Sequence, residues 1–385
     1  MSLLPSLGHK HTENPLTHST TQLLLTFTCR TYANPDDFAT NHDGTPIRWG
    51  FAMDFAERLP SLFPPSLTYK LNSKRWLGEC ALKSANDLLI DCAIPVCPNN
   101  APSATQWSYC TDTCEHCRVA VLSEINRVRD ILISRPLPYV LKLTQSLASV
   151  GTNIVRTPDE REAVLDKMTT YLRTYLPRIA QTNGHLHTTT LILSDAIPGE
   201  TMALNFYVTR AGGVVFLGAC HQLATGETGR QSTAITYASQ PALQKKYTDV
   251  LAQIATVLSA EGYYGPVGAD IMEDPATGQL YTIDLNVRTP LSLVLYLLRG
   301  HFFEQRGFAM ACVYECIILS IGRDELEERF SNEFQEGRVV LMGGTRLGAK
   351  EKWAYGVIVA GRDSGEIEGL TGRILKWEMG DQMDE

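Results

Sequence analysis

The stretch YTIDLNVR, residues 281–288, alternates strictly between apolar and polar positions. Its odd-numbered residues are apolar, and its even-numbered residues are Thr282, Asp284, Asn286 and Arg288. Such alternation predicts a β-strand with one face buried in a core and the other turned outward. A second strand is predicted in PVGADIMED, residues 266–274, and the glycine-containing segment PATGQ between the two suits a hairpin loop.

Two aspartates are expected to face each other across this hairpin. Pairing Asp274 with Leu280 at the turn places Asp270 directly opposite Asp284 and Met272 opposite Thr282. The Cβ atoms of directly opposed residues lie about 4.5–5.5 Å apart, so two carboxylates there repel each other. A cation between them would remove the repulsion.

The outward side chains of the second strand add two further groups to the aspartates. Asn286 supplies a third oxygen on the same face, and the guanidinium of Arg288 can hold a phosphate or carboxylate oxygen. A polar face can also simply meet solvent. The aspartate pair, the amide and the arginine together favour a Mg²⁺ site formed by Asp270, Asp284 and Asn286, because Mg²⁺ prefers oxygen ligands.

The remaining pattern predicts an α+β fold. Thr157, Pro158 and Glu160 have the spacing of a capping box at the start of a helix that ends at Pro177. A second helix is predicted over 241–262, and strands in LPYVLKL (137–143), 188–200 and 203–221. Residues 290–335 are expected to be mostly helical, followed by a strand pair in 338–344 and 353–361. Paired strands with separate helices indicate antiparallel sheets.

Composition narrows the class of protein. The chain has 385 residues, 44% of them apolar, and a formal net charge of −8. This acidity argues against a nucleic-acid or membrane-surface partner, and there is no run of about 18 apolar residues that would predict a membrane span. Ten cysteines without a secretory signal pattern favour reduced thiols and a cytoplasmic location.

We expect four regions along the chain. Residues 1–20 form a disordered tail, and 21–117 form an N-terminal domain whose fold is not evident. Residues 118–303 form the nucleotide- and Mg²⁺-binding core, and 304–385 complete the catalytic domain.

The hairpin and the segments before it resemble the ATP-grasp superfamily, and more closely its fungal secondary-metabolism members. The matching motifs are Asp270, the run DLNVR at 284–288, and YVLKLTQSLASVG at 139–151. The resemblance covers about residues 120–303. It implies that Mg²⁺-ATP lies between two antiparallel sheets.

The same resemblance implies roles for individual residues. Lys142 would contact the phosphates of ATP, and Ser146, Ser149 and Gly151 would belong to the phosphate loop. Met272 would lie beneath the adenine. The base edge would be met by the hinge segment Ser194, Asp195, Ala196 and Ile197, and the ribose by Glu200.

The activity that the resemblance implies is a carboxylate–amine ligase. ATP would activate a small-molecule carboxylic acid as an acyl phosphate, which an amine would convert to an amide, with Arg288 as the catalytic arginine and Lys142 beside it. Kinase-type phosphoryl transfer and a non-catalytic nucleotide-binding module are the alternatives. A homodimer is suggested by analogy alone.

Two further groups of residues could carry chemistry. CTDTCEHC at 110–117 spaces Cys110, Cys114 and Cys117 as in Fe–S or zinc sites, with His116, Cys97 or Cys92 as a fourth ligand, and plain reduced thiols are the other interpretation. His301 could be structural or contact substrate. Cys220 and His221 could face the pocket of the acceptor substrate.

Overall fold

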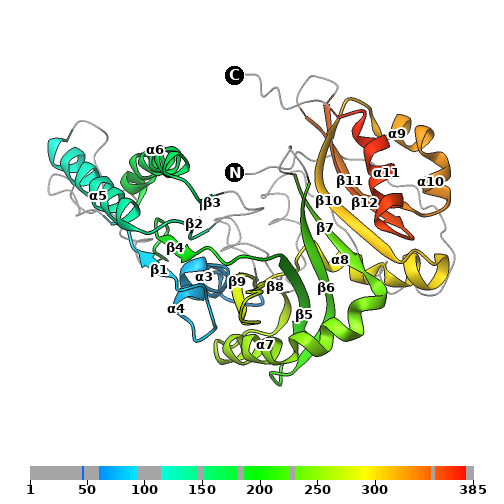
Figure 1. Ribbon diagram of the computed structural model, residues 1–385, viewed down its shortest axis with the longest axis horizontal. Coiled ribbons are helices and arrows are strands. Elements are labelled where there is room, and N and C mark those ends of the chain that lie inside the picture. The colour runs from blue at the N-terminus through cyan, green and yellow to red at the C-terminus, as the bar shows by residue number, and fades with distance from the viewer. Residues whose placement is uncertain are drawn as a thin grey trace.

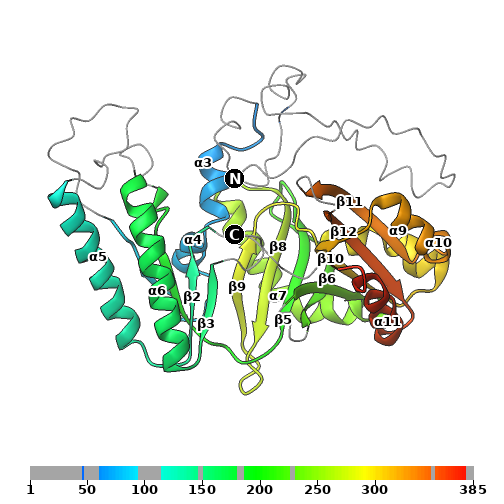
Figure 2. The same cartoon turned by 90° about the horizontal axis from the view of Figure 1, so that it is seen from above.

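The computed structural model describes Pro46 and residues 60–93, 114–145, 151–179, 186–225, 230–347 and 352–378. Two antiparallel sheets organise these residues (Figures 1 and 2): a small sheet with strand order β1-β4-β2-β3 and a large sheet with order β11-β12-β10-β7-β6-β5-β8-β9. The α+β class predicted from the sequence is confirmed. In the described residues, no helix is long and apolar enough to cross a membrane.

Two helices cover one face of the small sheet. Its strands are β1 (Leu88–Ile90), β2 (Tyr139–Leu143), β3 (Thr152–Val155) and β4 (Leu191–Asp195), and its helices are α5 (Glu115–Ser134) and α6 (Pro158–Tyr175), the latter followed by the short turn η2 (Leu176–Arg178). Tyr139 and Leu141 pack with α5 and α6 in a shared core. Val140 and Lys142 therefore lie on the opposite face, together with Ser194, which pairs with Val140.

The start of α6 follows the predicted capping box. The Thr157 hydroxyl accepts a hydrogen bond from the Glu160 backbone N–H at 3.2 Å, and the Glu160 carboxylate accepts one from the Thr157 N–H at 3.2 Å. Both bonds satisfy N–H groups that have no partner inside the helix.

The large sheet is covered on its outer face by two groups of helices (Figure 1). Its strands are β5 (Thr201–Val208), β6 (Val214–Thr225), β7 (Arg230–Thr236), β8 (Gly265–Glu273), β9 (Leu280–Asn286), β10 (Met310–Leu319), β11 (Val339–Leu347) and β12 (Lys352–Gly361). Helix α7 (Gln240–Ala260), which follows the turn η4 (Tyr237–Ser239), packs on β5 and β8. Helices α9 (Arg323–Arg329), α10 (Ser331–Gln335) and α11 (Ser364–Leu375) belong to the region of β10 to β12.

The other face of the large sheet carries Asp270 and is called the site face below. Part of it is covered by α8 (Leu293–Leu297) and the π-helical turn η5 (Gly300–Glu304). The prediction of a mostly helical segment over 290–335 is wrong for Met310–Leu319, which form β10 inside the sheet. This strand is buried on both faces at Cys312 and Val313, so it lacks the alternation that marks a half-exposed strand.

Residues 60–93 join both sheets. Helices α3 (Pro65–Leu71) and α4 (Lys74–Glu79) place Leu71 and Trp76 in the core beneath β5 and β8. After α4, the Lys83 carbonyl accepts from the Thr282 N–H of the large sheet at 2.9 Å, and the Ala85 carbonyl accepts from the Asp195 N–H of the small sheet at 2.8 Å. Residues 83–87 are therefore called the bridging segment. The predicted domain boundaries stay a prediction.

The β8–β9 hairpin pairs Asp270 with Asp284, in the predicted register. The predicted pairing of Met272 with Thr282 is wrong, since Met272 lies opposite Tyr281. The register shifts because β9 carries one extra residue, Ile283, in a β-bulge. Thr282 is consequently 2% exposed, so the strict alternation of YTIDLNVR does not continue through the bulge.

Candidate active site

Asp270 and Asp284 form a close pair of carboxylates on the site face. Burial raises the pKa of Asp270 to about 7, and the charge of Asp284 adds to the rise. A hydrogen bond with Gln222 of β6 and two nearby lysines act in the opposite direction. The two carboxylates therefore repel each other, as inferred from the sequence, and two lysines lie near enough to reduce this repulsion.

Lys142 reaches this pair from the small sheet. Its ammonium donates to the carbonyl of Ile283 at 2.8 Å, so the bulge in β9 supplies the acceptor. Burial lowers the pKa of Lys142, while Asp284, Asp87 and Asp270 oppose the shift. The lysine predicted to contact phosphates thus lies between the two sheets beside the aspartates.

Lys74 of α4 is a second cation at the pair, and the sequence analysis missed it. Its ammonium lies 2.9 Å from each carboxylate oxygen of Asp284, and its side chain is 9% exposed. Lys74 stands at the first position of its helix, and no acidic residue lies in that first turn. A positive charge at the positive end of the helix dipole is unfavourable unless an anion compensates it. Because no helix was predicted over 74–79, this indication of a partner anion appears only with the fold.

The start of α4 is also tied to the beginning of the phosphate loop. The Lys74 N–H donates to the Thr144 carbonyl at 2.9 Å, and the hydroxyls of Ser73 and Thr144 are 2.9 Å apart. Since Thr144 directly follows β2, these bonds hold the strand of Lys142 against the helix of Lys74.

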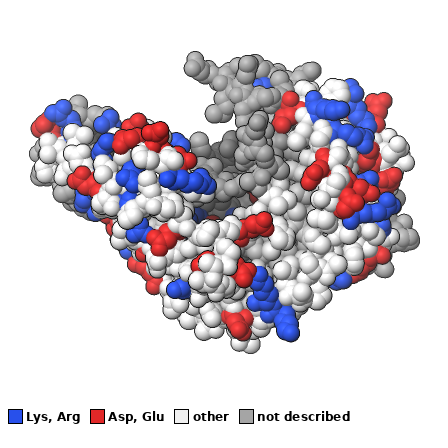
Figure 3. Space-filling view, in the orientation of Figure 1, with Lys and Arg blue, Asp and Glu red and all other residues white. Residues whose placement is uncertain are grey.

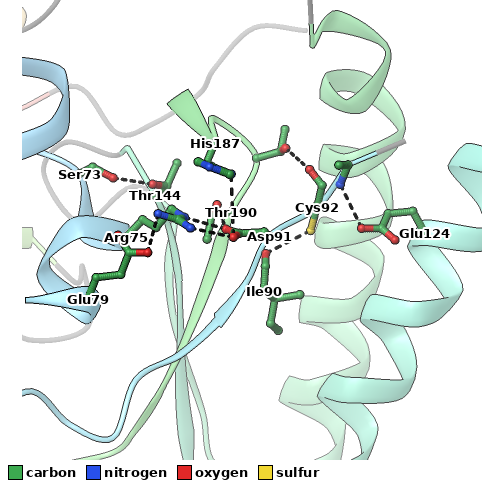
Figure 4. A network of polar contacts seen from close by, with 12 residues as sticks. Ser73, Arg75, Glu79, Ile90, Asp91, Cys92, Glu124, Thr144, His187 and Thr190 are labelled. Carbon is green, nitrogen blue, oxygen red and sulfur yellow. Dashed lines mark hydrogen bonds and ion pairs between the residues drawn. The ribbon is translucent and has the colours of Figure 1, made fainter. Parts of the chain in front are cut away.

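A network of polar contacts reinforces the same junction (Figure 4). Arg75 donates two hydrogen bonds of 2.8 Å to the carboxylate of Asp91, which also accepts from the Thr190 hydroxyl at 2.6 Å. The Arg75 hydrogen bonds are the main cause that lowers the pKa of Asp91 to about 2. This ion pair connects α4 to the end of β1 and the start of β4.

Asn286 and Arg288 lie at the far end of β9. An Arg288 Nη2–H donates to Asn286 Oδ1 at 2.7 Å. Burial lowers the pKa of Arg288, while the charges of Asp284, Glu315 and Asp270 oppose the shift. Asn286 pairs with Gly268, where a Cβ atom would approach the Pro290 Cβ to 2.9 Å, so the absence of a side chain makes room for this turn.

The predicted nucleotide residues lie around this cluster. Ser194 is 1% exposed and donates to an Asp87 oxygen at 2.5 Å, whereas Asp195 accepts from Asn86 at 2.6 Å. Half-buried Ala196 and Ile197 follow in the connection to β5.

Two further predicted nucleotide residues lie on the large sheet. Met272, two residues after Asp270 on β8, is half-buried. The Glu200 side chain is 88% exposed and lies 3.8 Å from His221.

Gly151 closes the predicted phosphate loop. Its carbonyl accepts from the Leu143 N–H at 3.1 Å, and its φ is +82°. A Cβ atom there would lie 2.7 Å from Leu143 Cδ1, so both conformation and space require glycine. Ser146 and Ser149 lie outside the described residues.

Cys220 does not face a pocket. It is fully buried in the core under α8 and donates to the Ser292 carbonyl at 3.9 Å, and burial raises the pKa of its thiol. The expectation that Cys220 faces the acceptor is therefore wrong, because the chain after Arg288 covers this part of the site face. His221 pairs with Met202, which packs toward α7, so His221 lies on the outer face.

The remaining candidate residues from the sequence are His301 and the cysteines of the possible metal site. The His301 ring lies 3.0 Å from the Gly337 carbonyl. Cys92 and Cys117 are buried in the core of α5 and α6, whereas Cys97 and Cys110 lie outside the described residues. In the part of the chain that the structure describes, no three His, Cys, Asp or Glu residues are grouped to hold a metal ion.

The space-filling view shows a hollow between the lobe of α5 and α6 and the lobe of the large sheet (Figure 3). The lysines and aspartates described above come from elements on both of its sides. The arrangement can hold a strongly anionic molecule between the two sheets.

Comparisons with known proteins support the fold. No family model matches the sequence, and no curated protein matches it either. Among solved structures, L-amino acid ligase from Bacillus licheniformis has a TM-score of 0.51 at 14% identity, over 90% of this chain and 83% of that chain.

Two other solved structures have lower scores. Phosphoribosylamine–glycine ligase from Thermotoga maritima has a TM-score of 0.47 at 12% identity, over 82% of this chain and 77% of that chain. N5-carboxyaminoimidazole ribonucleotide synthetase from Thermus thermophilus has a TM-score of 0.44 at 14% identity, over 86% and 79%. Together, the order of the two sheets, the paired aspartates of the β8–β9 hairpin and the likeness to the Bacillus ligase establish that this chain has the ATP-grasp fold.

Proposed function

We propose that this chain is an ATP-dependent carboxylate–amine ligase that forms an amide through an acyl phosphate. One observation carries the proposal: two lysines lie beside the paired aspartates of the large sheet. Lys74 of α4 forms an ion pair with Asp284, and Lys142 of the small sheet donates to the neighbouring Ile283 carbonyl. Two ammonium groups and two carboxylates, which are hard oxygen ligands, suit the binding of a nucleoside triphosphate with its metal ion. The fold shared with an L-amino acid ligase agrees with this chemistry.

The donor set fits Mg²⁺. Asp270 and Asp284 are a half-buried pair of carboxylates, and burial together with the charge of Asp284 raises the pKa of Asp270. Asn286 offers a neutral oxygen two residues after Asp284. Mg²⁺ typically takes one or two carboxylates and completes its shell with phosphates and water. When bound, it would neutralise charge on the phosphates of ATP.

Different residues of the chain would bind the phosphates, the adenine and the ribose of ATP. Lys142 and Lys74 would contact the phosphates, and the loop closed by Gly151 would cover them with backbone N–H groups. The segment from Ser194 to Ile197 would meet the adenine edge, with Met272 below the base. Glu200 would reach the ribose only by turning from its exposed position beside His221.

The reaction would occur in two displacements. A carboxylate oxygen of the acid attacks the γ-phosphorus, and the bond to the β-phosphate oxygen breaks, giving an acyl phosphate and ADP. The uncharged amine nitrogen then attacks the acyl carbon, and the bond between that carbon and the phosphate oxygen breaks. The nitrogen loses one proton, which the departing phosphate takes up, so that the products are the amide and hydrogen phosphate. Arg288 would hold the acyl phosphate and then the oxyanion of the tetrahedral intermediate, as a preorganised donor.

The test measures ADP release from Mg²⁺-ATP with a panel of carboxylic acids, with and without amines. Hydroxylamine serves as a general trap because it converts acyl phosphates to hydroxamates. We expect hydroxamate with a specific acid, its loss in Asp284→Ala, and its retention in the control Asp249→Ala on the exposed side of α7. ADP without hydroxamate would instead indicate transfer to a hydroxyl. ATP binding without ADP would indicate a non-catalytic module.

A further inference from the structure

The bridging segment runs alongside the end of β4, as a continuation of β1. Strand β1 is antiparallel to β4, and extending its register by one and two residues places Asp87 opposite Ser194 and Asn86 opposite Asp195. The side chains make the contacts that this register requires. The Ser194 hydroxyl donates to Asp87 Oδ1 at 2.5 Å, and the Asn86 amide donates to Asp195 Oδ2 at 2.6 Å. The bridging segment is therefore a direct neighbour of the hinge segment.

These contacts engage the polar groups of the first two hinge residues. The other oxygen of Asp195 accepts a hydrogen bond from Arg135 at the end of α5, and the Asp195 N–H donates to the Ala85 carbonyl at 2.8 Å. Both oxygens of Asp195 thus have a donor. In Asp87, by contrast, Oδ1 accepts from Ser194, and no hydrogen bond within the described residues reaches Oδ2. An ionised carboxylate accepts at both oxygens, so Asp87 keeps capacity to accept beside the hinge.

Asp87 lies on the face of the small sheet that looks toward the large sheet. Ser194, its neighbour across the strands, pairs on its other side with Val140, and Lys142 follows two residues later on the same face. Since Lys142 donates to the Ile283 carbonyl of β9, this face is turned toward the site face. The charge of Asp87 also acts on Lys142. The half-buried carboxylate of Asp87 is therefore directed into the space that the two sheets share.

Helix α4 passes over this face without covering Asp87 by a side chain. A Cβ atom at Gly78 would lie 2.9 Å from Leu89 Cδ2 and 3.6 Å from Asp87 Oδ2. Glycine thus allows α4 to pack closely on β1 and leaves the second oxygen of Asp87 uncovered by a side chain at this position. Lys74 precedes Gly78 by four residues, which is about 6 Å along the helix axis. Asp87 consequently lies near the two lysines of the site, on the side of the hinge.

A carboxylate at this place distinguishes between purine bases. The amino group of adenine is a hydrogen-bond donor, whereas guanine and hypoxanthine carry a carbonyl oxygen at the same ring position. An ionised carboxylate can only accept, so it pairs with the amino group and repels the carbonyl oxygen. Two facing acceptors would also both lose their hydrogen bonds with water. The same group therefore favours one class of base and disfavours the other.

We propose that Asp87 accepts a hydrogen bond from the amino group of adenine and so selects adenine nucleotides over nucleotides with an oxygen at that position. The inference rests on the proposed binding of ATP with its base at the hinge segment, and it adds a specificity residue outside that segment. The Ser194 hydroxyl would be a positioning group, because it fixes one oxygen of Asp87 and leaves the other for the base.

The experiment measures dissociation constants for Mg²⁺-ADP and Mg²⁺-inosine diphosphate by calorimetry, where no turnover occurs. Inosine diphosphate carries an oxygen in place of the amino group. The chains are the wild type, Asp87→Asn, and the control Asp130→Asn, which removes a carboxylate from the exposed side of α5 in the same lobe. Asparagine keeps the shape of the side chain and an oxygen for Ser194, but it can present N–H donors to the base. The ratio of the two constants within one chain cancels any loss of folded protein.

We expect the wild-type chain to bind ADP more tightly than inosine diphosphate. In Asp87→Asn this preference should fall about ten- to a hundredfold, the range typical of a hydrogen bond to a charged group, and the control should keep it. An unchanged preference in Asp87→Asn would overturn the proposal. Equal weakening of both nucleotides would overturn it as well, because Asp87 would then act by holding Lys142 or the hinge rather than by contacting the base.

The same measurement separates this inference from the proposed ligase activity. A reduced preference in Asp87→Asn supports the role of Asp87 even if no acid yields hydroxamate. An unchanged preference in a chain that does form hydroxamate refutes the role of Asp87 and leaves the ligase proposal standing. A wild-type chain that binds neither nucleotide refutes both.

Discussion

Replacing Lys74 by methionine removes the charge that faces Asp284 and keeps most of the length and apolar volume of the side chain. Breaking a buried ion pair by deleting one partner typically costs about 3–5 kcal/mol. Here the Asp284 side chain is 25% exposed and Lys142 remains nearby, so water and a second cation offset part of the loss. We therefore expect Lys74→Met to lower the free energy of unfolding by about 2–3 kcal/mol at pH 8.

The matched control is Lys70→Met in α3. Lys70 forms an ion pair of 2.6 Å with Glu261, but the two side chains are 46% and 30% exposed. Exposed pairs contribute about 0–1 kcal/mol, so this variant should unfold close to the wild-type urea midpoint. The two variants remove the same group from the same kind of contact, and they differ in burial.

The loss in Lys74→Met should also shrink at low pH. Because burial and Asp284 raise the pKa of Asp270 to about 7, that carboxyl is protonated in the folded chain at pH 5. The pair then carries a single negative charge, which Lys142 can compensate. Urea unfolding at pH 5 and pH 8 measures the difference, and ATP titration should show weaker binding. Equal losses in the two lysine variants, or a loss independent of pH, would refute this account of Lys74.

Three other substitutions test separate parts of the structure. Arg288→Ala should lower kcat about 10²–10³-fold with little change in ATP affinity, and equal losses in both would contradict its role at the acyl group. Asp91→Asn should destabilise the chain by about 1 kcal/mol at neutral pH. Because the pKa of Asp91 is lowered from 3.8 to about 2, its stabilisation is present above pH 3.8 and is lost as pH falls through 2, so acid titration of unfolding should bring the two chains together. Gly151→Ala should destabilise by about 1–3 kcal/mol and weaken ATP binding, measured by unfolding and calorimetry, and unchanged values would show that the loop does not need the positive φ.

The sequence predicted the contacts that local pattern determines. Alternation and a short turn were sufficient to place Asp270 opposite Asp284, because hairpin register follows from turn length over a few residues. Alternation could not predict the bulge at Ile283, since an inserted residue changes the pairing without changing the apolar pattern. The missed pairing of Met272 and the carbonyl that receives Lys142 both follow from that bulge.

Contacts between segments far apart in the chain could not be predicted from the sequence pattern. Lys74 and Asp284 are 210 residues apart, and no periodicity links a helix start in one region to a strand in another. Glu315 lies in β10, which was predicted as part of a helical region because its central residues are buried on both faces. The buried position of Cys220 depends in the same way on α8 crossing the sheet.

The bridging segment has a consequence for motion between the two lobes. The Lys83 carbonyl is hydrogen-bonded to the large sheet and the Ala85 carbonyl to the small sheet. A rotation that separates the two sheets while keeping both bonds would have its axis close to these atoms. Displacement grows with distance from such an axis. Atoms beside this axis would move little, while the outer edge of the small sheet would move much further, so the two sheets could separate and return to the same alignment.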